Sequence, residues 1–201
     1  MNYVKLLRDG QAVWGVLQGD LVRTLTSPPF EALCYGGESL PLEACRLLAP
    51  CEATKIVCVG KNYYDHALEM GEGVPEQPIL FLKAPCLNDV TARDVQKGDG
   101  QWTRGKSMDG FAPIGPVVTD EVDPSCLAIE TRLNGAVVQQ GNTSQFMTAV
   151  PQLLEFITAS MTLEPGDVVT TGTPAGIGPM VPGDTVEVTV QGIGTLRNHI
   201  V

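Results

Sequence analysis

The chain has 201 residues, of which 43% are hydrophobic and 18% are charged, as expected for one compact domain or for a domain with a small appendage. Its formal net charge of −10 at pH 7 argues against nucleic acid or an anionic membrane surface as a partner. A small anionic substrate stays compatible with this charge, because a local group of lysines and arginines can hold one. The sequence has no apolar run long enough to span a membrane and no signal-peptide pattern, so we expect a cytoplasmic protein.

The six cysteines include no Cys-x-x-Cys pair, and this spacing indicates reduced thiols rather than a zinc site or a disulfide framework. The two histidines, His66 and His199, are too few for a histidine-rich metal site. The reduced thiols agree with a cytoplasmic location.

Residues 1–50 are predicted to form a small β-rich lead-in. Their short apolar runs are separated by Asp9-Gly10 and Gly19-Asp20, which are typical of hairpin turns. A short helix is expected over residues 40–48, ended by Pro50. We therefore predict an N-terminal subdomain over residues 1–50 and a larger domain over residues 51–201.

The larger domain begins with an apolar run at residues 55–60 that predicts a buried strand ending in glycine. A helix is expected next over residues 62–70, with Gly71 as its terminating residue. A second apolar strand is expected at residues 79–83. Residues 105–115 are loop-like, and such a stretch is either a mobile cover for a site or a simple connection.

The rest of the larger domain is rich in predicted strands. The Asn134-Gly135 dipeptide is a strong hairpin signal between strands at residues 128–133 and 136–140. A helix is expected over residues 151–160, and the last predicted strands lie at residues 167–171, 185–190 and 194–201. Because strands outnumber helices and do not alternate with them, the sequence predicts a strand-dominated α+β fold rather than a doubly wound sheet.

His66 and Glu69 are a candidate pair for acid–base chemistry. They lie three residues apart on a predicted helix and therefore on one face of it. A carboxylate beside an imidazole orients the ring and raises its basicity, which suits a general acid or base. The alternative is an incidental contact on a surface helix.

Residues 88–94 bring Asn88, Asp89, Arg93 and Asp94 close together in sequence. Oxygen-rich clusters of this kind suit Mg²⁺, and an arginine can hold a substrate carboxylate. The alternative is a polar turn with an internal Asp–Arg pair.

Residues 170–178 form a loop rich in glycine and threonine directly after a predicted strand. Its backbone N–H groups and hydroxyls could cradle a carboxylate, but the loop has neither the Walker A order nor the Gly-x-Gly-x-x-Gly order. A tight turn without a ligand is an equally good interpretation.

Six segments of the chain form an ordered series of motifs. They are residues 56–66 (Ile-Val-Cys-Val-Gly-Lys-Asn-Tyr-Tyr-Asp-His), 78–83 (Pro-Ile-Leu-Phe-Leu-Lys), 88–96, 102–106 (Trp-Thr-x-x-Lys), 141–143 (Gly-Asn-Thr) and 171–178 (Thr-Gly-Thr-Pro-x-Gly-x-Gly). Over essentially the whole chain this series resembles the fumarylacetoacetate hydrolase family, in particular its branch of acylpyruvases, fumarylpyruvate hydrolases and 2-hydroxyhepta-2,4-diene-1,7-dioate isomerases. The resemblance implies the family's mixed β-sheet roll, which makes residues 51–201 the catalytic domain.

The resemblance also implies roles for single residues. His66 and Glu69 match the family's catalytic dyad, which activates water. Asp89 matches one carboxylate ligand of the family's Mg²⁺, and Lys106 matches the lysine that faces the metal-bound substrate. Thr173 matches the threonine that contacts a substrate carboxyl group.

Arg93 and Gln96 match positions in or near the family's pocket. The implied cofactor is Mg²⁺, with Mn²⁺ or Ca²⁺ as substitutes. The implied partners are a small anionic 2-oxo acid and a second copy of the chain in a homodimer, with no nucleic acid and no membrane.

One part of the family pattern is missing from the sequence. Relatives carry a long segment between the positions of Pro85 and Cys86, and this segment includes the Glu-x-Glu pair that completes the Mg²⁺ site. Either the molecule carries residues beyond this sequence, or the segment is a true internal deletion. A Cα–Cα distance of about 3.8 Å between Pro85 and Cys86 would exclude the first explanation.

The leading hypothesis is a Mg²⁺-dependent hydrolase that cleaves a C–C bond of an acylpyruvate or fumarylpyruvate type of 2-oxo acid. Oxaloacetate-type decarboxylation and hydroxy-dienedioate isomerisation are alternatives within the family. A catalytically inactive relative that binds a small carboxylate or a partner is an alternative of another class, as is a truncated product that folds poorly.

Overall fold

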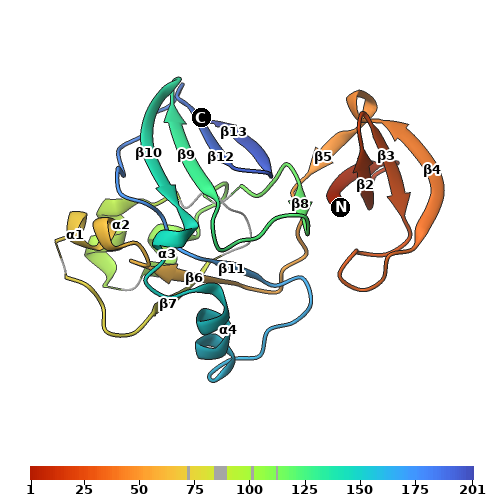
Figure 1. Ribbon diagram of the computed structural model, residues 1–201. Helices are drawn as coiled ribbons and strands as arrows, with labels where there is room; N and C mark the ends of the chain where they lie inside the picture. The colour runs from red at the N-terminus through yellow and green to blue at the C-terminus, as the bar shows by residue number, and fades with distance from the viewer. Residues whose placement is uncertain (72, 84–89, 101, 112) are drawn as a thin grey trace.

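The computed structural model describes residues 1–71, 73–83, 90–100, 102–111 and 113–201. Strands dominate it, and they form three sheets with four α-helices at their edges and faces (Figure 1). The predicted strand-dominated α+β fold is confirmed. Within the described ranges no helix is long and apolar enough to cross a membrane.

The first sheet is built mainly from residues 1–50. Its strand order is β4-β3-β2-β1-β5, with β8 also pairing with β1. The bounds are β1 (Asn2–Arg8), β2 (Gln11–Gln18), β3 (Leu21–Leu25), β4 (Tyr35–Pro41), β5 (Arg46–Leu48) and β8 (Val118–Thr119). The hairpin turn between β1 and β2 places Asp9 and Gly10 at positive φ, as the sequence predicted. Figure 1 shows this sheet set to one side of the other two.

The prediction of a helix over residues 40–48 was wrong. The chain forms only a 3₁₀ turn, η1 (Leu42–Ala44), and then enters β5. Strand β5 pairs with β1, with Leu47 opposite Leu6. Pairing with an existing sheet therefore decided the structure of this segment against its local helix propensity.

The second sheet has the order β11-β6-β7 and forms the centre of the larger domain. Strand β6 (Ile56–Gly60) lies between β11 (Val168–Thr170), which is parallel to it, and β7 (Ile79–Lys83), which is antiparallel. Residues 56–59 of β6 are all buried. A strand that is covered on both faces needs apolar side chains at successive positions, and this continuous apolar run is the pattern that predicted the strand.

The third sheet has the order β10-β9-β12-β13. Its strands are β9 (Ala128–Leu133), β10 (Ala136–Asn142), β12 (Thr185–Val190) and β13 (Gly194–His199). Asn134 and Gly135 join β9 to β10 with φ of 51° and 83°. Positive φ at both positions of a two-residue turn matches the right-handed twist of the strands, so the predicted hairpin is confirmed.

Short helices surround the central sheet. They are α1 (Tyr64–Glu69), α2 (Arg93–Asp99), α3 (Trp102–Lys106), α4 (Val150–Thr158) and the 3₁₀ turn η2 (Thr143–Gln145). The helix predicted over residues 151–160 is confirmed as α4, whose Leu153 and Ile157 are fully buried. The helix predicted over residues 62–70 is the shorter α1.

A buried carboxylate fixes the segment that joins the two parts of the chain. The Asp167 side chain, only 2% exposed, accepts hydrogen bonds from Thr54, Lys55 and Glu164 and forms an ion pair with Lys55. Burial alone would raise the pKa of Asp167, but these hydrogen bonds together outweigh burial and hold the pKa well below its ordinary value. Residues 54–55 are thereby tied to the turn that leads into β11.

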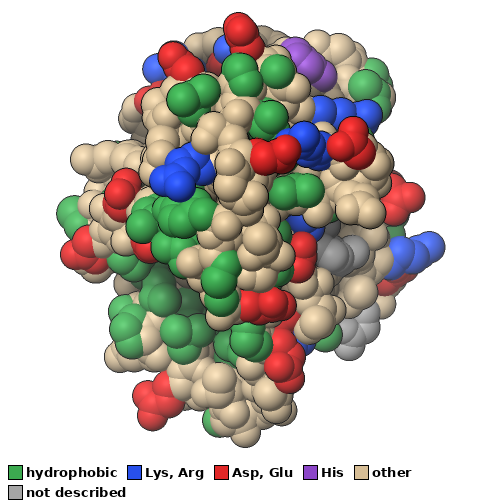
Figure 2. Space-filling model, turned by 90° about the vertical axis from the view of Figure 1, so that its right-hand side faces the viewer, with side chains coloured by type: hydrophobic (Ala, Val, Ile, Leu, Met, Phe, Trp, Pro, Cys, Tyr) green, Lys and Arg blue, Asp and Glu red, His purple; other side chains and the backbone are tan. Residues whose placement is uncertain are grey.

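The side of the molecule that carries the first sheet is chemically mixed. Figure 2 shows acidic and basic side chains interspersed on this face, with apolar side chains gathered in its lower part. This face shows no continuous basic surface of the kind that binds a polyanion.

Candidate active site

The candidate site begins where β6 ends. Asn62, 3% exposed, donates from Nδ2 to the carbonyl oxygens of Thr148 and Thr171 at 3.1 and 3.0 Å, and its Oδ1 accepts from the Thr148 N–H at 2.8 Å. One side chain thus joins the end of β6 to the segments before α4 and after β11. Asn62 is therefore a structural anchor, and it orients the start of α1.

His66 and Glu69 form a hydrogen-bonded pair on α1. The distance from His66 Nδ1 to Glu69 Oε2 is 3.2 Å, and His66 is 6% exposed. A carboxylate can only accept, so Nδ1 carries the proton and Nε2 is left as the basic nitrogen. The face shared by residues three apart in the predicted helix is present in the structure.

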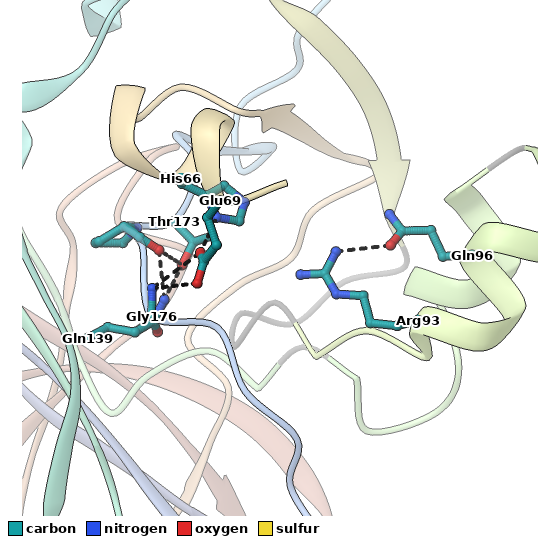
Figure 3. A network of polar contacts seen from close by, with 8 residues as sticks. His66, Glu69, Arg93, Gln96, Gln139, Thr173 and Gly176 are labelled. Carbon is teal, nitrogen blue, oxygen red and sulfur yellow. Dashed lines mark hydrogen bonds and ion pairs between the residues drawn. The ribbon is translucent and has the colours of Figure 1, made fainter. Parts of the chain in front are cut away.

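Glu69 is held from its other side by the loop that follows β11. The Gly176 N–H lies 3.1 Å from Oε1 and 3.2 Å from Oε2 of Glu69 (Figure 3). Gly176 has a φ of +99°, and a Cβ on it would lie 2.1 Å from the carbonyl oxygen of Val138. Only glycine fits there, and the carboxylate that this loop holds is that of Glu69.

Thr173 lies in the same loop and its hydroxyl accepts a hydrogen bond from Gln139 Nε2 at 3.0 Å. The Gln139 amide also donates to the carbonyl oxygen of Pro174 at 2.8 Å. Strand β10, which carries Gln139, therefore sets the position of the threonine beside the dyad (Figure 3).

Arg93 and Gln96 come from α2 and bond to each other. Arg93 Nη1 donates to Gln96 Oε1 at 3.0 Å, and Gln96 is buried. In Figure 3 the guanidinium end of Arg93 points toward the side on which His66 and Glu69 lie. Gln96 acts through this bond as a support that fixes the arginine.

Lys106 closes the site from α3. Its Nζ lies 5.0 Å from the centre of the Phe81 ring, and the residue is 4% exposed. Phe81 in turn contacts Trp102 edge to face, with ring centres 5.3 Å apart. The Phe81 ring thus lies against the ammonium group at the wall of the site.

Several of these residues line one pocket that opens to solvent. Its cavity volume is about 30 Å³, which is enough for a water molecule or two. Its lining brings together His66, Arg93, Lys106 and Thr173 from four separate segments, and it adds Lys61, which sequence reasoning did not single out. The available signal was the place of Lys61 directly between Gly60 and Asn62, at the end of a central strand.

Tyr63 borders the same segment from inside the core. It is 3% exposed, its ring contacts Phe146 edge to face at 5.1 Å, and its hydroxyl has no hydrogen-bond partner among the described residues. Burial raises the pKa of Tyr63 to about 12. The phenol is therefore neutral at physiological pH.

The described residues do not fit a Mg²⁺ site. Among them, no group of three or more His, Cys, Asp or Glu side chains is placed to hold a metal ion. Mg²⁺ requires an octahedral shell of oxygen ligands, with carboxylates as its usual protein donors. The predicted ligand Asp89 lies outside the described residues, as do Pro85 and Cys86.

Comparison with known proteins places this geometry in a family. The profile "Fumarylacetoacetate (FAA) hydrolase C-terminal" matches residues 85–201, and "Rv2993c-like, N-terminal" matches residues 1–50. A protein of Archaeoglobus fulgidus is 42% identical, with 85% of this chain and 88% of that protein covered. The oxaloacetate tautomerase YisK of Bacillus subtilis is 33% identical, with 75% and 71% covered.

The crystal structure of 2-hydroxyhepta-2,4-diene-1,7-dioate isomerase from Mycobacterium marinum is similar in fold and sequence. It superposes with a TM-score of 0.89 at 36% identity and covers 100% of this chain and 98% of that one.

The alignments with the Archaeoglobus fulgidus protein and with YisK are both longer than the number of residues that this chain contributes to them. The one with the Archaeoglobus fulgidus protein spans 220 positions, whereas 85% of 201 residues is about 171, which leaves about 49 positions without a residue of this chain. The one with YisK spans 213 positions against about 151 residues, which leaves about 62. With its profile match, its relatives and its fold taken together, the chain belongs to the fumarylacetoacetate hydrolase family.

Proposed function

We propose that the chain is an enzyme that moves a proton on a small anionic 2-oxo acid, in a keto–enol tautomerisation or a related isomerisation. The observation that carries the proposal is the His66–Glu69 pair beside a pocket lined by cationic side chains. An oriented imidazole supplies a general base near neutral pH, and fixed cations stabilise the charge that develops on oxygen.

In the proposed step, His66 Nε2 removes a proton from the carbon next to the keto group. The C–H electron pair becomes the C=C bond of the enolate, and the carbonyl π pair moves onto oxygen. Lys106 lies where it can stabilise that negative oxygen, and Arg93 can bind a carboxylate with its planar fork. Return of the proton from His66 to the oxygen completes the conversion to the enol.

Glu69 has a supporting role in this scheme. It holds the proton on His66 Nδ1 and stabilises the imidazolium that forms, while the Gly176 N–H fixes the carboxylate. This arrangement resembles other acid–base dyads in which a third group orients the base.

One observation favours proton transfer over the C–C hydrolysis expected from the resemblance. Two of the relatives named above are a tautomerase and an isomerase. Hydrolysis and decarboxylation are therefore alternative outcomes of the activity test.

A second candidate function is binding of a small carboxylate without turnover. The Glu-x-Glu segment missing from the sequence favours it, because a relative without its catalytic metal ligands can keep its anion pocket. It predicts binding of the anion with no reaction.

The activity test is a panel of 2-oxo acids incubated in deuterated water, with EDTA in one arm and Mg²⁺ in the other. Deuterium incorporation next to the keto group, followed by NMR, reports proton transfer, and the same spectra report C–C cleavage or loss of CO₂. We expect His66→Gln to lower the exchange rate by about 10²–10⁴-fold. His199→Gln removes the chain's other, exposed histidine and is the matched control.

Two outcomes would contradict the proposal. Exchange that persists in His66→Gln would show that another group is the base. Absence of exchange across the panel, with the pocket still binding anions, would support the binding function instead.

The proposal also places the protein in the cytoplasm as a homodimer. The five described cysteines are free thiols, which suits a reducing compartment. Val137, Val138 and Val181 are exposed apolar side chains of the kind that a subunit contact covers. Light scattering of the purified protein would report the oligomeric state directly.

A further inference from the structure

We infer that Gln139 is a positioning residue for the pocket: its side-chain amide binds the oxygen of the Thr173 hydroxyl and so directs the hydroxyl proton toward an anion that enters the pocket. This inference rests on the proposed function, because it concerns the same site, and it adds a residue that has no part in the proposed step. Gln139 is not among the described residues that line the pocket, so its effect on a bound anion passes through Thr173, which does line it.

The orientation of the Gln139 amide follows from its two partners. Nε2 lies 2.8 Å from the carbonyl oxygen of Pro174 and 3.0 Å from Oγ1 of Thr173 (Figure 3). A backbone carbonyl can only accept a hydrogen bond, so the end of the amide that faces both atoms has to be the NH₂ group. This group has two N–H bonds, one for each partner, and Thr173 Oγ1 is therefore an acceptor in this contact.

The Thr173 proton is thereby left for another acceptor. A hydroxyl has one proton and two lone pairs, and Gln139 occupies one of the lone pairs. Within the described part of the chain, the hydroxyl otherwise lies 3.5 Å from the Pro174 carbonyl oxygen, which is long for a hydrogen bond, and this oxygen already accepts from Gln139. So weak a contact is readily exchanged for a charged acceptor.

The pocket offers room for such an acceptor. Thr173 lines it together with His66 and Arg93. The cavity there has the size of a water molecule or two, so one carboxylate oxygen fits it. A hydrogen bond from a hydroxyl to a carboxylate is charge-assisted and stronger than one to a neutral carbonyl. An anion is therefore the favoured acceptor for the Thr173 O–H, and Gln139 keeps that O–H directed to it.

The shape of β10 explains why Gln139 faces the loop. The register of β10 against β9 shifts between Val137 and Gln139, which marks a β-bulge, and bulges re-aim the side chains beside them. The strand and the loop also pack closely, because a Cβ on Gly141 would lie 2.7 Å from Cγ of Pro174. Little space is left between them, so the Gln139 amide is held against Thr173.

The same loop carries Gly176, whose N–H bonds to Glu69, and this separates two roles for Gln139. If Gln139 only tied the loop to β10, its loss would move Gly176 as well, disturb the His66–Glu69 pair and lower kcat. If it orients the Thr173 proton, its loss weakens binding of the anion before and during the reaction alike, which raises KM and leaves kcat nearly unchanged.

Oxalate is the probe for binding, because it is a small carboxylate without a C–H bond and cannot undergo exchange. Calorimetric titrations are done in EDTA and in MgCl₂, and each variant is compared with wild type in the same buffer. We expect Gln139→Met, which removes the N–H donors at a similar side-chain length, to weaken oxalate by about five- to tenfold. Gln140→Met is the matched control and should change the affinity by less than about twofold, because the exposed Gln140 side chain donates to Glu130 outside the pocket.

Two further variants show whether the effect passes through the hydroxyl. In a Thr173→Val background, which has no hydroxyl, Gln139→Met should change oxalate affinity by less than about twofold. Gln139→Glu should weaken oxalate more than Gln139→Met does at pH 7, because a carboxylate can only accept and turns the Thr173 O–H away from the pocket. A cooperative thermal transition in each variant shows that it is folded.

Several results would overturn the inference. They are a lack of oxalate binding to wild type in both buffers, an effect of Gln139→Met below about twofold, and an equal effect of Gln139→Met with and without the Thr173 hydroxyl. In the deuterium-exchange assay, a fall in kcat with unchanged KM would also overturn it, because it would show that Gln139 only ties the loop to β10.

Failure of the proposed function gives a different result. Weaker oxalate binding in Gln139→Met, without any deuterium exchange in wild type, keeps the inference and overturns the proton-transfer function. Exchange in wild type with unchanged oxalate affinity in Gln139→Met overturns the inference and leaves that function.

Discussion

Replacing Asp167 by alanine removes the acceptor of five hydrogen bonds. The donors are the N–H groups of Thr54, Lys55 and Glu164, the Thr54 hydroxyl and the Lys55 ammonium group. Because the side chain is 2% exposed, water does not fully replace it. Thr54 and Glu164 are exposed residues, so water recovers part of the loss at those donors.

The magnitude follows from these contacts. Hydrogen bonds to a charged group contribute about 1.5–3 kcal/mol each, but donors that can turn to water lose less. We expect Asp167→Ala to lower the free energy of unfolding by about 3 kcal/mol. Asp167→Asn should lower it by about 2 kcal/mol, because the amide oxygen still accepts some of these hydrogen bonds. Against a typical stability of about 5–15 kcal/mol, either loss is measurable.

The effect depends on pH in a defined direction. The pKa of Asp167 is lowered in the folded state, so its stabilisation is fully present above the pKa of about 3.9 that an aspartate has in an unfolded chain. It is lost as the pH falls below that value toward the lower folded-state pKa. The difference in free energy of unfolding between wild type and Asp167→Asn should therefore decrease by about 1 kcal/mol between pH 5 and pH 3.

Urea unfolding of wild type, Asp167→Ala and Asp167→Asn at a series of pH values measures these quantities. Asp9→Asn is the control, because the Asp9 side chain is 92% exposed and asparagine tolerates its positive φ. A loss below about 1 kcal/mol at pH 7, or a loss that does not change with pH, would show that the Asp167 carboxylate does not stabilise the fold in this way.

Two further substitutions have defined outcomes. Gly176→Ala places a Cβ 2.1 Å from the Val138 carbonyl oxygen, so we expect it to displace the Gly176 N–H from Glu69. The free energy of unfolding should fall by about 2 kcal/mol, and the rate of deuterium exchange should fall as well. Gly178→Ala has open space around its Cβ and should change neither, which urea unfolding and the exchange assay check together. Tyr63→Phe removes a buried hydroxyl without a partner among the described residues, and thermal unfolding should show unchanged or higher stability, by up to about 1 kcal/mol.

The elements that the sequence predicted well are those whose signal is local. The Asn134-Gly135 turn requires positive φ at both positions, and asparagine followed by glycine is the pair that accepts it. The strand at residues 56–60 is buried on both faces, and only a continuous apolar run satisfies that environment. Helix α4 shows its buried face in Leu153 and Ile157, which lie one turn apart.

The segment at residues 40–48 shows the limit of local signals. Nothing within it indicates that residues 46–48 pair with β1, because the partner strand lies about forty positions earlier in the chain. Pairing across such a distance is decided when the whole sheet forms.

The candidate site divides in the same way. The shared helix face of His66 and Glu69 and the glycine-rich loop after a strand could be predicted, since both depend on residues close together in the chain. The contact of this loop with Glu69, the support of Arg93 by Gln96 and the place of Lys61 in the pocket lining emerged only from the folded chain. Those contacts join α1, α2, β10 and the loop after β11, and their geometry depends on how the sheets pack rather than on any single segment.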